Sequence, residues 1–303
     1  MPQALVAFMI LFLGAAILRA FNVLNRSHAE RLASLVFSIS LPATILVSLD
    51  RIPFTHSAWK LPVAAALVTL PMLLLTWQLA RLLRLPRPTR GGLLLGTGCI
   101  NSIYFAYPVV LATLGDAGLG HAVLFDLGQT TLTLTLLYAL ALWHGTASSS
   151  AGTTMRRFLA APPLWALSGV LLLKLFDLHL PSWLHDLLLP LHFTTTPLAS
   201  LVLGLSISLS GHGKFTLAAF GVVLRMGGGL LLGFGAAELL RLAGVERVVV
   251  ILVAGMPSAV TAVIFAAEAG LDEELVASIV TLSVAIGVAL LPSLPHFVNW
   301  LAG

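Results

Sequence analysis

Residues 98–115 read Gly-Cys-Ile-Asn-Ser-Ile-Tyr-Phe-Ala-Tyr-Pro-Val-Val-Leu-Ala-Thr-Leu-Gly, and this stretch decides the fold. It lies in an apolar segment, 91–114, that is long enough to cross a bilayer as a helix, yet Asn101, Ser102 and Pro108 interrupt it. Proline removes a backbone donor and clashes with the preceding turn, so we expect the helix to kink or open at Pro108. In lipid, an opened backbone persists only where protein or a watery cavity satisfies the freed carbonyls.

The second half of the chain repeats this arrangement. The apolar segment 248–270 is interrupted by Gly255-Met256-Pro257-Ser258. Two interrupted membrane segments in corresponding positions of two halves are the best sequence indication of a transporter's binding site. The pattern therefore predicts a substrate site built from both interruptions.

The composition is that of an integral membrane protein. Hydrophobic residues make up 58% of the 303 residues and charged residues only 9%, against about a quarter charged in soluble domains. The net charge of +4 comes from arginines in short loops, where they set orientation, so we expect no nucleic-acid partner. The single cysteine, Cys99, excludes an intramolecular disulfide. No nucleophile elbow, phosphate-binding loop or His-Glu-x-x-His motif is present, so we do not expect an enzyme.

Apolar stretches of roughly 20 residues indicate ten transmembrane helices. They fall at 4–24, 32–49, 61–83, 91–114, 119–143, 162–178, 184–209, 215–240, 247–269 and 275–300. A Ser/Thr/Gly/Ala-rich run within 145–160 separates five spans in 1–144 from five in 161–303 and reads as a cytoplasmic linker. An odd number of crossings per half is the condition for two inverted five-helix repeats.

Basic residues in the turns predict the orientation, because they stay on the cytoplasmic side. The even-numbered turns hold only Arg51, Lys60, Lys174, Arg241 and Arg247. The odd-numbered turns hold Arg19, Arg26, Arg31, Arg81, Arg84, Arg87, Arg90, Arg156, Arg157 and Lys214. We therefore place the odd turns inside and both termini outside. Asp272, Glu273 and Glu274 in the ninth turn run against the pattern, although acidic residues contribute little to it.

The polar residues at the two interruptions suit an anion. Asn101 and Ser102 in one half, and Ser258 and Thr261 beside Pro257 in the other, offer uncharged hydrogen-bonding groups. If the two broken helices cross, the positive ends of their half-helix dipoles point to a shared centre, which favours an anion. The competing interpretation is that Asn101 only ties two helices together.

Two ionisable residues within the spans are further candidates. Arg225 is the deepest, and a buried charge is by default a functional hypothesis: it could attract an anionic substrate or pair with Asp126. Asp126 could instead carry a coupling proton, with Gln129 one turn further along. His185 and His192 share a helix face, but no third ligand accompanies them in the sequence, so we expect no metal site and no cofactor.

These residues resemble a known family. The run Asn101–Pro108 resembles the Asn-x-Gly-x-x-Gly-x-Pro signature of the fourth span of auxin efflux carriers, although its two glycines are Ile103 and Ala106 here. Met256-Pro257-Ser258-Ala259 looks like that family's ninth span, and Leu41-Pro42-Ala43 resembles its second. Arg225 matches a basic residue common in the eighth, and the short central loop is typical of bacterial members.

The resemblance implies a fold like that of sodium/proton antiporters and bile-acid symporters, with broken, crossing helices four and nine. Helices 1, 2, 6 and 7 would form a scaffold, and helices 3–5 and 8–10 a moving transport domain that works as an elevator. Substrates of relatives are organic anions, and relatives are often homodimers. The residues carried over to the site are Asn101, Pro108, Gln129, Pro257 and Ser258, with Thr44 facing them from the scaffold.

We interpret the chain as a secondary active transporter of a small organic anion, such as a mono- or dicarboxylate, in a bacterial inner membrane. Its coupling ion would be H⁺ or Na⁺. One alternative is a cation/proton antiporter of the same fold, in which Asp126 would be essential. Another is a membrane sensor that binds a ligand without moving it, and a third is a channel, which two inverted halves make less favoured than a carrier.

Overall fold

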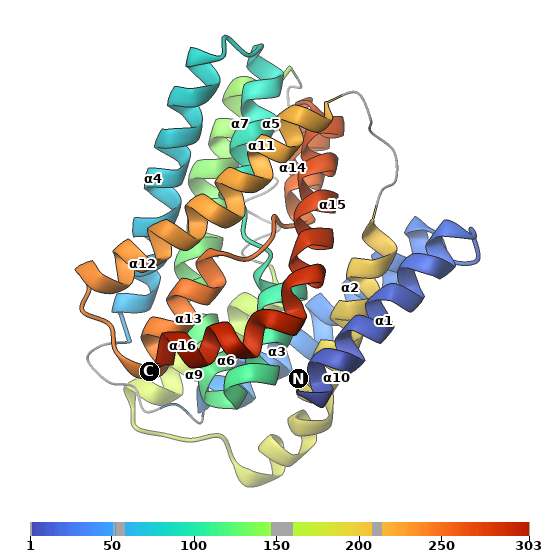
Figure 1. Cartoon of the computed structure of the whole chain (residues 1–303). Helices are drawn as coiled ribbons and strands as arrows, with labels where there is room; N and C mark the ends of the chain where they lie inside the picture. Colours follow the sequence, from blue (N-terminus) through green and yellow to red (C-terminus); the bar gives the residue numbers. More distant parts are fainter. Residues whose placement is uncertain (1, 51, 53–57, 147–159, 208–213, 303) are drawn as a thin grey trace. The chain divides into compact units, whose positions relative to one another are not determined.

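Helices make up most of the described residues, which are 2–50, 52, 58–146, 160–207 and 214–302 of the computed structural model (Figure 1). Within this part, seven helices are long and apolar enough to cross a membrane by length and composition. Pro162–Leu175 is a shorter apolar helix. The protein is therefore all-α and suited to several membrane crossings. Residues 147–159 of the expected linker, and Arg51, lie outside the described residues.

The helices group into two compact units, and each unit draws on both halves of the chain. Unit 1 comprises Met1–Ala58, Ile103–Val123 and Met155–Ile207. Unit 2 comprises Trp59–Ser102, Leu124–Thr154 and Ser208–Gly303. The chain passes from unit 2 to unit 1 inside a π-helical turn, η2 (Ser102–Ala106), and back inside α6 (Tyr107–Leu132).

Unit 1 is held by close helix contacts and buried polar pairs. Its helices, besides the first part of α6, are α1 (Gln3–Ala20), α2 (Arg26–Leu35), η1 (Val36–Ser40), α3 (Leu41–Asp50), α9 (Pro162–Leu175) and α10 (Ser182–Ser206). Gly204 of α10 lies so close to α1 that a Cβ there would clash with the carbonyl oxygen of Phe12. The hydroxyls of Thr44 and Thr195 share a buried 2.7 Å hydrogen bond that joins α3 to α10.

Unit 2 contains the two interrupted helices. Its elements, besides the last part of α6, are α4 (Lys60–Leu82), α5 (Arg87–Gly98), η3 (Thr133–Leu137), α7 (Tyr138–His144), α11 (Phe215–Val222), η4 (Val223–Gly228), α12 (Gly229–Leu239), α13 (Gly244–Ala254), α14 (Thr261–Ala269), α15 (Glu273–Leu290), η5 (Leu291–Ser293) and α16 (Leu294–Ala302). Part of its core consists of Ala80, Leu93, Ala218, Val222, Leu275 and Ile279, from four helices.

The first interruption lies earlier in the sequence than Pro108. The helix opens at Cys99–Asn101, between the end of α5 at Gly98 and the start of η2, and Pro108 sits in the first turn of α6. The helix therefore does not open at Pro108 itself, although a π-turn, a common site of helix kinks, precedes the proline. The wider π-turn immediately before it gives the proline ring room, so the chain does not need to open there. The second interruption falls between α13 and α14, over the predicted Gly255–Ser258.

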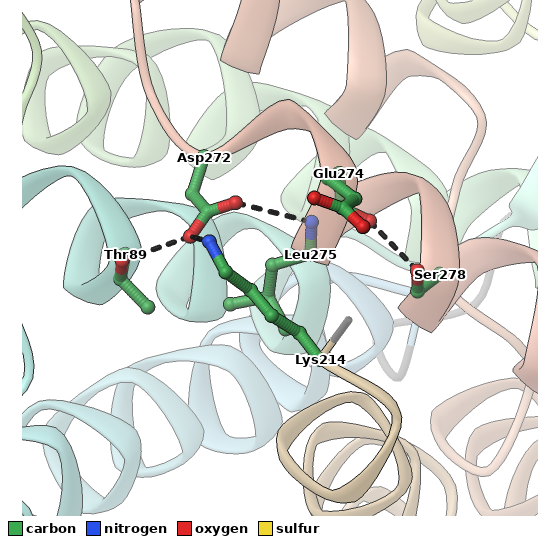
Figure 2. A network of polar contacts seen from close by, with 6 residues as sticks. All are labelled: Thr89, Lys214, Asp272, Glu274, Leu275 and Ser278. Carbon is green, nitrogen blue, oxygen red and sulfur yellow. Dashed lines mark hydrogen bonds and ion pairs between the residues drawn. The ribbon is translucent and has the colours of Figure 1, made fainter. Parts of the chain in front are cut away.

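Asp272 contacts residues at or next to the starts of three helices, and Figure 2 shows these contacts. Its carboxylate accepts hydrogen bonds from Thr89 Oγ1 of α5 (2.8 Å) and from the N–H of Leu275 in α15 (3.3 Å). It also forms an ion pair with Lys214, the residue before α11. Burial raises the pKa of Asp272, but the Lys214 ammonium and the two hydrogen bonds outweigh it and hold that pKa below its usual value. One of the three acidic residues of the ninth turn, Asp272, is thus paired with a basic residue of the seventh.

Candidate functional site

The two interruptions meet within unit 2 and bond to each other. The N–H of Asn101 donates to the carbonyl of Pro257 (2.9 Å), and the N–H of Ala259 donates to the carbonyl of Cys99 (3.1 Å). Ile100 and Ser258 form an antiparallel bridge between these bonds. Main-chain groups of each segment have lost their helical hydrogen bonds, and the other segment supplies new partners for them. An apolar surrounding requires such partners.

Asn101 and Ser258 make further hydrogen bonds at this contact. The Asn101 side chain is 2% exposed, and its Nδ2 donates a long hydrogen bond (3.4 Å) to the carbonyl of Ser258. The N–H of Ser258 donates to Oγ of Ser283 in α15 (3.0 Å), which in turn donates to the carbonyl of Val280. The Asn101 amide thus adds one long hydrogen bond between the two segments, and α15 supports them through Ser283.

Two hydroxyls at the contact have no hydrogen-bond partner in the part of the chain that the structure describes. The Oγ atoms of Ser102 and Ser258 are buried, and neither finds a hydrogen-bond partner among the described residues. A buried polar group without a partner costs roughly 1–3 kcal/mol, so native proteins rarely keep one without a use. These hydroxyls are the groups of the contact that are available to a polar ligand.

Arg225 lies at the ends of the two half-helices that lead into the interruptions. Its side chain is 0% exposed and starts from the π-turn η4. Its Nη1 donates to the carbonyl of Thr97 near the end of α5 (2.6 Å), and its Nη2 to the carbonyl of Ala254 at the end of α13 (2.5 Å). The hydrogen bonds of the guanidinium go to these carbonyls and not to Asp126, the pairing that the sequence offered as an alternative.

Gln129 occupies a comparable position beside α5. Its Nε2 donates to the carbonyl of Gly98 (2.8 Å) and to Oγ1 of Thr133 (3.3 Å), and its Oε1 accepts from Oγ1 of Thr69 (2.5 Å). The side chain is 1% exposed. One turn earlier, the partly buried Asp126 accepts a hydrogen bond from Thr130 (3.4 Å).

The remaining candidates are placed as follows. Pro257 is buried in the second interruption, whereas Thr261 begins α14 and is exposed. Thr44 and Pro108 are buried in unit 1, where Thr44 is engaged by Thr195. The structure thus brings Asn101, Ser102, Pro257 and Ser258 together at one contact, with Arg225 and Gln129 at the adjoining helix ends.

Sequence reasoning missed Thr69 and Ser283, which hold Gln129 and Ser258. The signal that could have found them is a hydroxyl inside an apolar span, but helices carry many such residues that bond to their own backbone, as Ser168 does.

One of the two histidines, His192, lies next to an acidic residue that is distant from it in the sequence. His192 of α10 is buried, and its Nε2 lies 3.3 Å from Oδ1 of Asp116 in α6, within unit 1. In the part of the chain that the structure describes, no cluster of three or more histidine, cysteine or acidic side chains could hold a metal ion.

Comparisons with known proteins give one consistent result. A family model described as "Membrane transport protein" matches residues 1–297. An uncharacterized transporter of Methanothermobacter thermautotrophicus is 29% identical over 295 residues, which cover 96% of each chain. An uncharacterized transporter of Methanocaldococcus jannaschii is 28% identical over 271 residues, which cover 86% of each chain.

Proposed function

Because the chain belongs to the auxin efflux carrier family of membrane transport proteins, we propose that it is a secondary active carrier of a small organic anion. The family is described as one of membrane transport proteins, and both relatives are named as transporters. The anionic substrate, such as a mono- or dicarboxylate, is our inference from the site.

The observation that carries the proposal is the pair of buried, unpartnered hydroxyls of Ser102 and Ser258. Both lie where helices restart: Ser102 opens η2, and α14 begins three residues after Ser258 without a side-chain cap. Hydroxyls donate to carboxylates, and the starts of helices carry a positive partial charge. We propose that these groups, with the Asn101 amide and Thr261, bind the carboxylate, and that Pro257 shapes the pocket.

The charges near the site favour an anion over a cation. The Arg225 guanidinium bonds to carbonyls at the ends of α5 and α13 and so offsets their negative partial charge, which would otherwise oppose an anion. The acidic candidate, Asp126, is only partly buried. We propose Asp126 as the group that would accept a proton if transport is proton-coupled.

We further propose an elevator mechanism in which unit 2 carries the substrate and unit 1, with Thr44 and Pro108, stays fixed. In support, unit 2 contains both interruptions and is tied together by Asp272 and Arg225. We propose ten crossings, a homodimer, and both termini outside the cytoplasmic membrane.

Thermal stabilisation of the purified protein by a panel of mono- and dicarboxylates tests the proposal. A ligand at a hundred times its dissociation constant should stabilise by about 2.7 kcal/mol. We expect Ser258→Ala to weaken binding of the hit by roughly tenfold or more, because a hydrogen bond to a charged group is lost. The same variant should lose no stability, since none of the described residues bonds to this hydroxyl.

Asn101→Ala should also lose binding and remain folded, since its side-chain bond is long. Ser278→Ala, whose hydroxyl bonds to the carbonyl of Glu274 one turn back in α15, is the matched control and should bind normally. Uptake or efflux of the hit in liposomes then separates a carrier from a sensor. If no carboxylate stabilises the protein but a lower pH does, the assignment of an anionic substrate is wrong. The protein is then a proton-coupled cation carrier.

A further inference from the structure

The buried guanidinium of Arg225 bonds to two carbonyls that belong to different half-helices. Thr97 is the second-last residue of α5, and Ala254 is the last residue of α13. Both half-helices end at the interruptions. The arginine therefore bridges the two carboxyl-terminal helix ends beside the proposed substrate site.

The carbonyls of these ends are nearly all accounted for. In α13, the N–H of Gly255 bonds to the carbonyls of Ile251 and Leu252, and the N–H of Met256 to that of Val253. The last carbonyl, that of Ala254, is left for Arg225. In α5, Gln129 takes the last carbonyl, that of Gly98, and Arg225 takes the one before it.

The charge of the arginine matches what the helix ends present. The carboxyl-terminal end of a helix is equivalent to roughly half a negative charge, so two such ends together present about one. In carriers with broken helices, unwound carbonyls and half-helix ends are the groups that coordinate a coupling Na⁺. Here one covalently held cation already lies between the two ends.

We propose that Arg225 is a built-in counter-ion that takes the place of a bound Na⁺ at the crossing, so the transport cycle uses no Na⁺ there. This inference rests on the proposed carrier function and specifies its ion coupling. The energy for transport then comes from the anion gradient or from protons.

The surrounding backbone fits a guanidinium closely. A Cβ at Gly229, the first residue of α12, would clash with both the carbonyl of Ala254 and Nη2 of Arg225. The planar fork of arginine places two donors at fixed separation, whereas a lysine ammonium is a single point of charge. Arg225→Lys should therefore satisfy one helix end less well.

The test measures the thermal midpoint of wild type, Arg225→Ala and Arg225→Lys in choline, Na⁺, Li⁺ and methylguanidinium chlorides at equal ionic strength. No substrate is present, so failure of anion binding does not affect the result. We expect wild type to respond equally to all four salts. We expect Arg225→Ala to be unstable in choline and to be stabilised saturably by low-millimolar methylguanidinium or Na⁺, by roughly 5 °C near saturation. The thermal midpoint of Arg225→Lys in choline should lie between those of wild type and Arg225→Ala.

Two results would overturn the proposal. The first is a saturable stabilisation of wild type by Na⁺ over choline. The second is an Arg225→Ala protein that is as stable as wild type in choline or that no cation rescues. Should Arg225→Ala not fold in choline, the yield of monodisperse protein purified in methylguanidinium becomes the readout, and an unchanged yield counts against the counter-ion role.

Discussion

Gln129 uses its whole side-chain amide within the protein. Its oxygen accepts from Thr69, and its nitrogen donates to Thr133 and to the carbonyl that ends α5. A substrate could reach these atoms only by displacing buried hydrogen bonds. The role that the contacts support is to position the end of α5, one residue before the interruption, and not to touch the substrate directly.

Gln129→Leu should therefore destabilise the protein before it affects substrate recognition. The change leaves the carbonyl of Gly98 and the hydroxyl of Thr69 without partners, at about 1–3 kcal/mol each. We expect the thermal midpoint to fall by roughly 5–10 °C. Thr131→Ala, on the exposed side of the same helix, is the control and should change little. Unchanged stability with lost anion binding would instead place Gln129 among the substrate ligands.

Some residues of the candidate site can be predicted from the sequence, and others cannot. Asn101 and Ser258 stand out because they are polar residues beside breaks in apolar segments. The partners of Arg225 could not be foreseen, because main-chain carbonyls belong to every residue and leave no mark in the sequence. For the same reason, an ion pair with Asp126 was the natural alternative from side chains alone.

Helix α12 depends on glycines for its approach to α13. Besides Gly229, Gly233 one turn later faces α13, where an added Cβ would lie 2.7 Å from Cβ of Ala254. Gly235 of the same helix has no atom within 4 Å of the Cβ position. Small residues at membrane helix contacts allow this close packing.

Gly229→Ala should push α12 away from α13 and disturb the Arg225 bridge. Overpacking of this kind costs about 1–3 kcal/mol, and the backbone carbonyl of Ala254 cannot move aside easily. Gly235→Ala is the matched control, since it meets open space and gains helix propensity. We expect a lower thermal midpoint for the first and an equal or higher one for the second. Equal midpoints for both variants would show that the two helices can separate without loss.

The extents of two helices followed from apolar length, whereas the position of the first break did not. The predicted spans 61–83 and 215–240 agree with the helical stretches Lys60–Leu82 and Phe215–Leu239 within one residue at each end. The opening at Cys99–Asn101 is instead decided by hydrogen bonds to Pro257 and Ala259, from the other half of the chain. Local propensity, dominated by Pro108, carries no information on such a partner.

At the scale of the whole molecule, unit 2 gathers several turns at one end. Asp272 in the turn before α15 contacts Thr89 at the start of α5 and Lys214 before α11. Arg87, in the same turn as Thr89, donates to the carbonyl of Trp143 near the end of α7. By contrast, Arg247 at the start of α13 donates to the carbonyl of Leu301 in the last helix. The turns that join α4 to α5 and α14 to α15 must therefore face the same side of a membrane.

Labelling with a membrane-impermeant maleimide in intact cells tests both this grouping and the orientation set by the arginines. Pro86→Cys and Glu273→Cys lie in the two grouped turns, and Ala243→Cys lies between α12 and α13; all three positions are exposed. We expect Ala243→Cys to react in intact cells, and the other two only after permeabilisation, because the arginine-rich turn stays inside. Wild type, with only the buried Cys99, is the unreactive control. If both Pro86→Cys and Glu273→Cys react in intact cells, the predicted orientation is wrong but the fold still holds. If these two positions react differently from each other, the result contradicts the Asp272 contacts themselves.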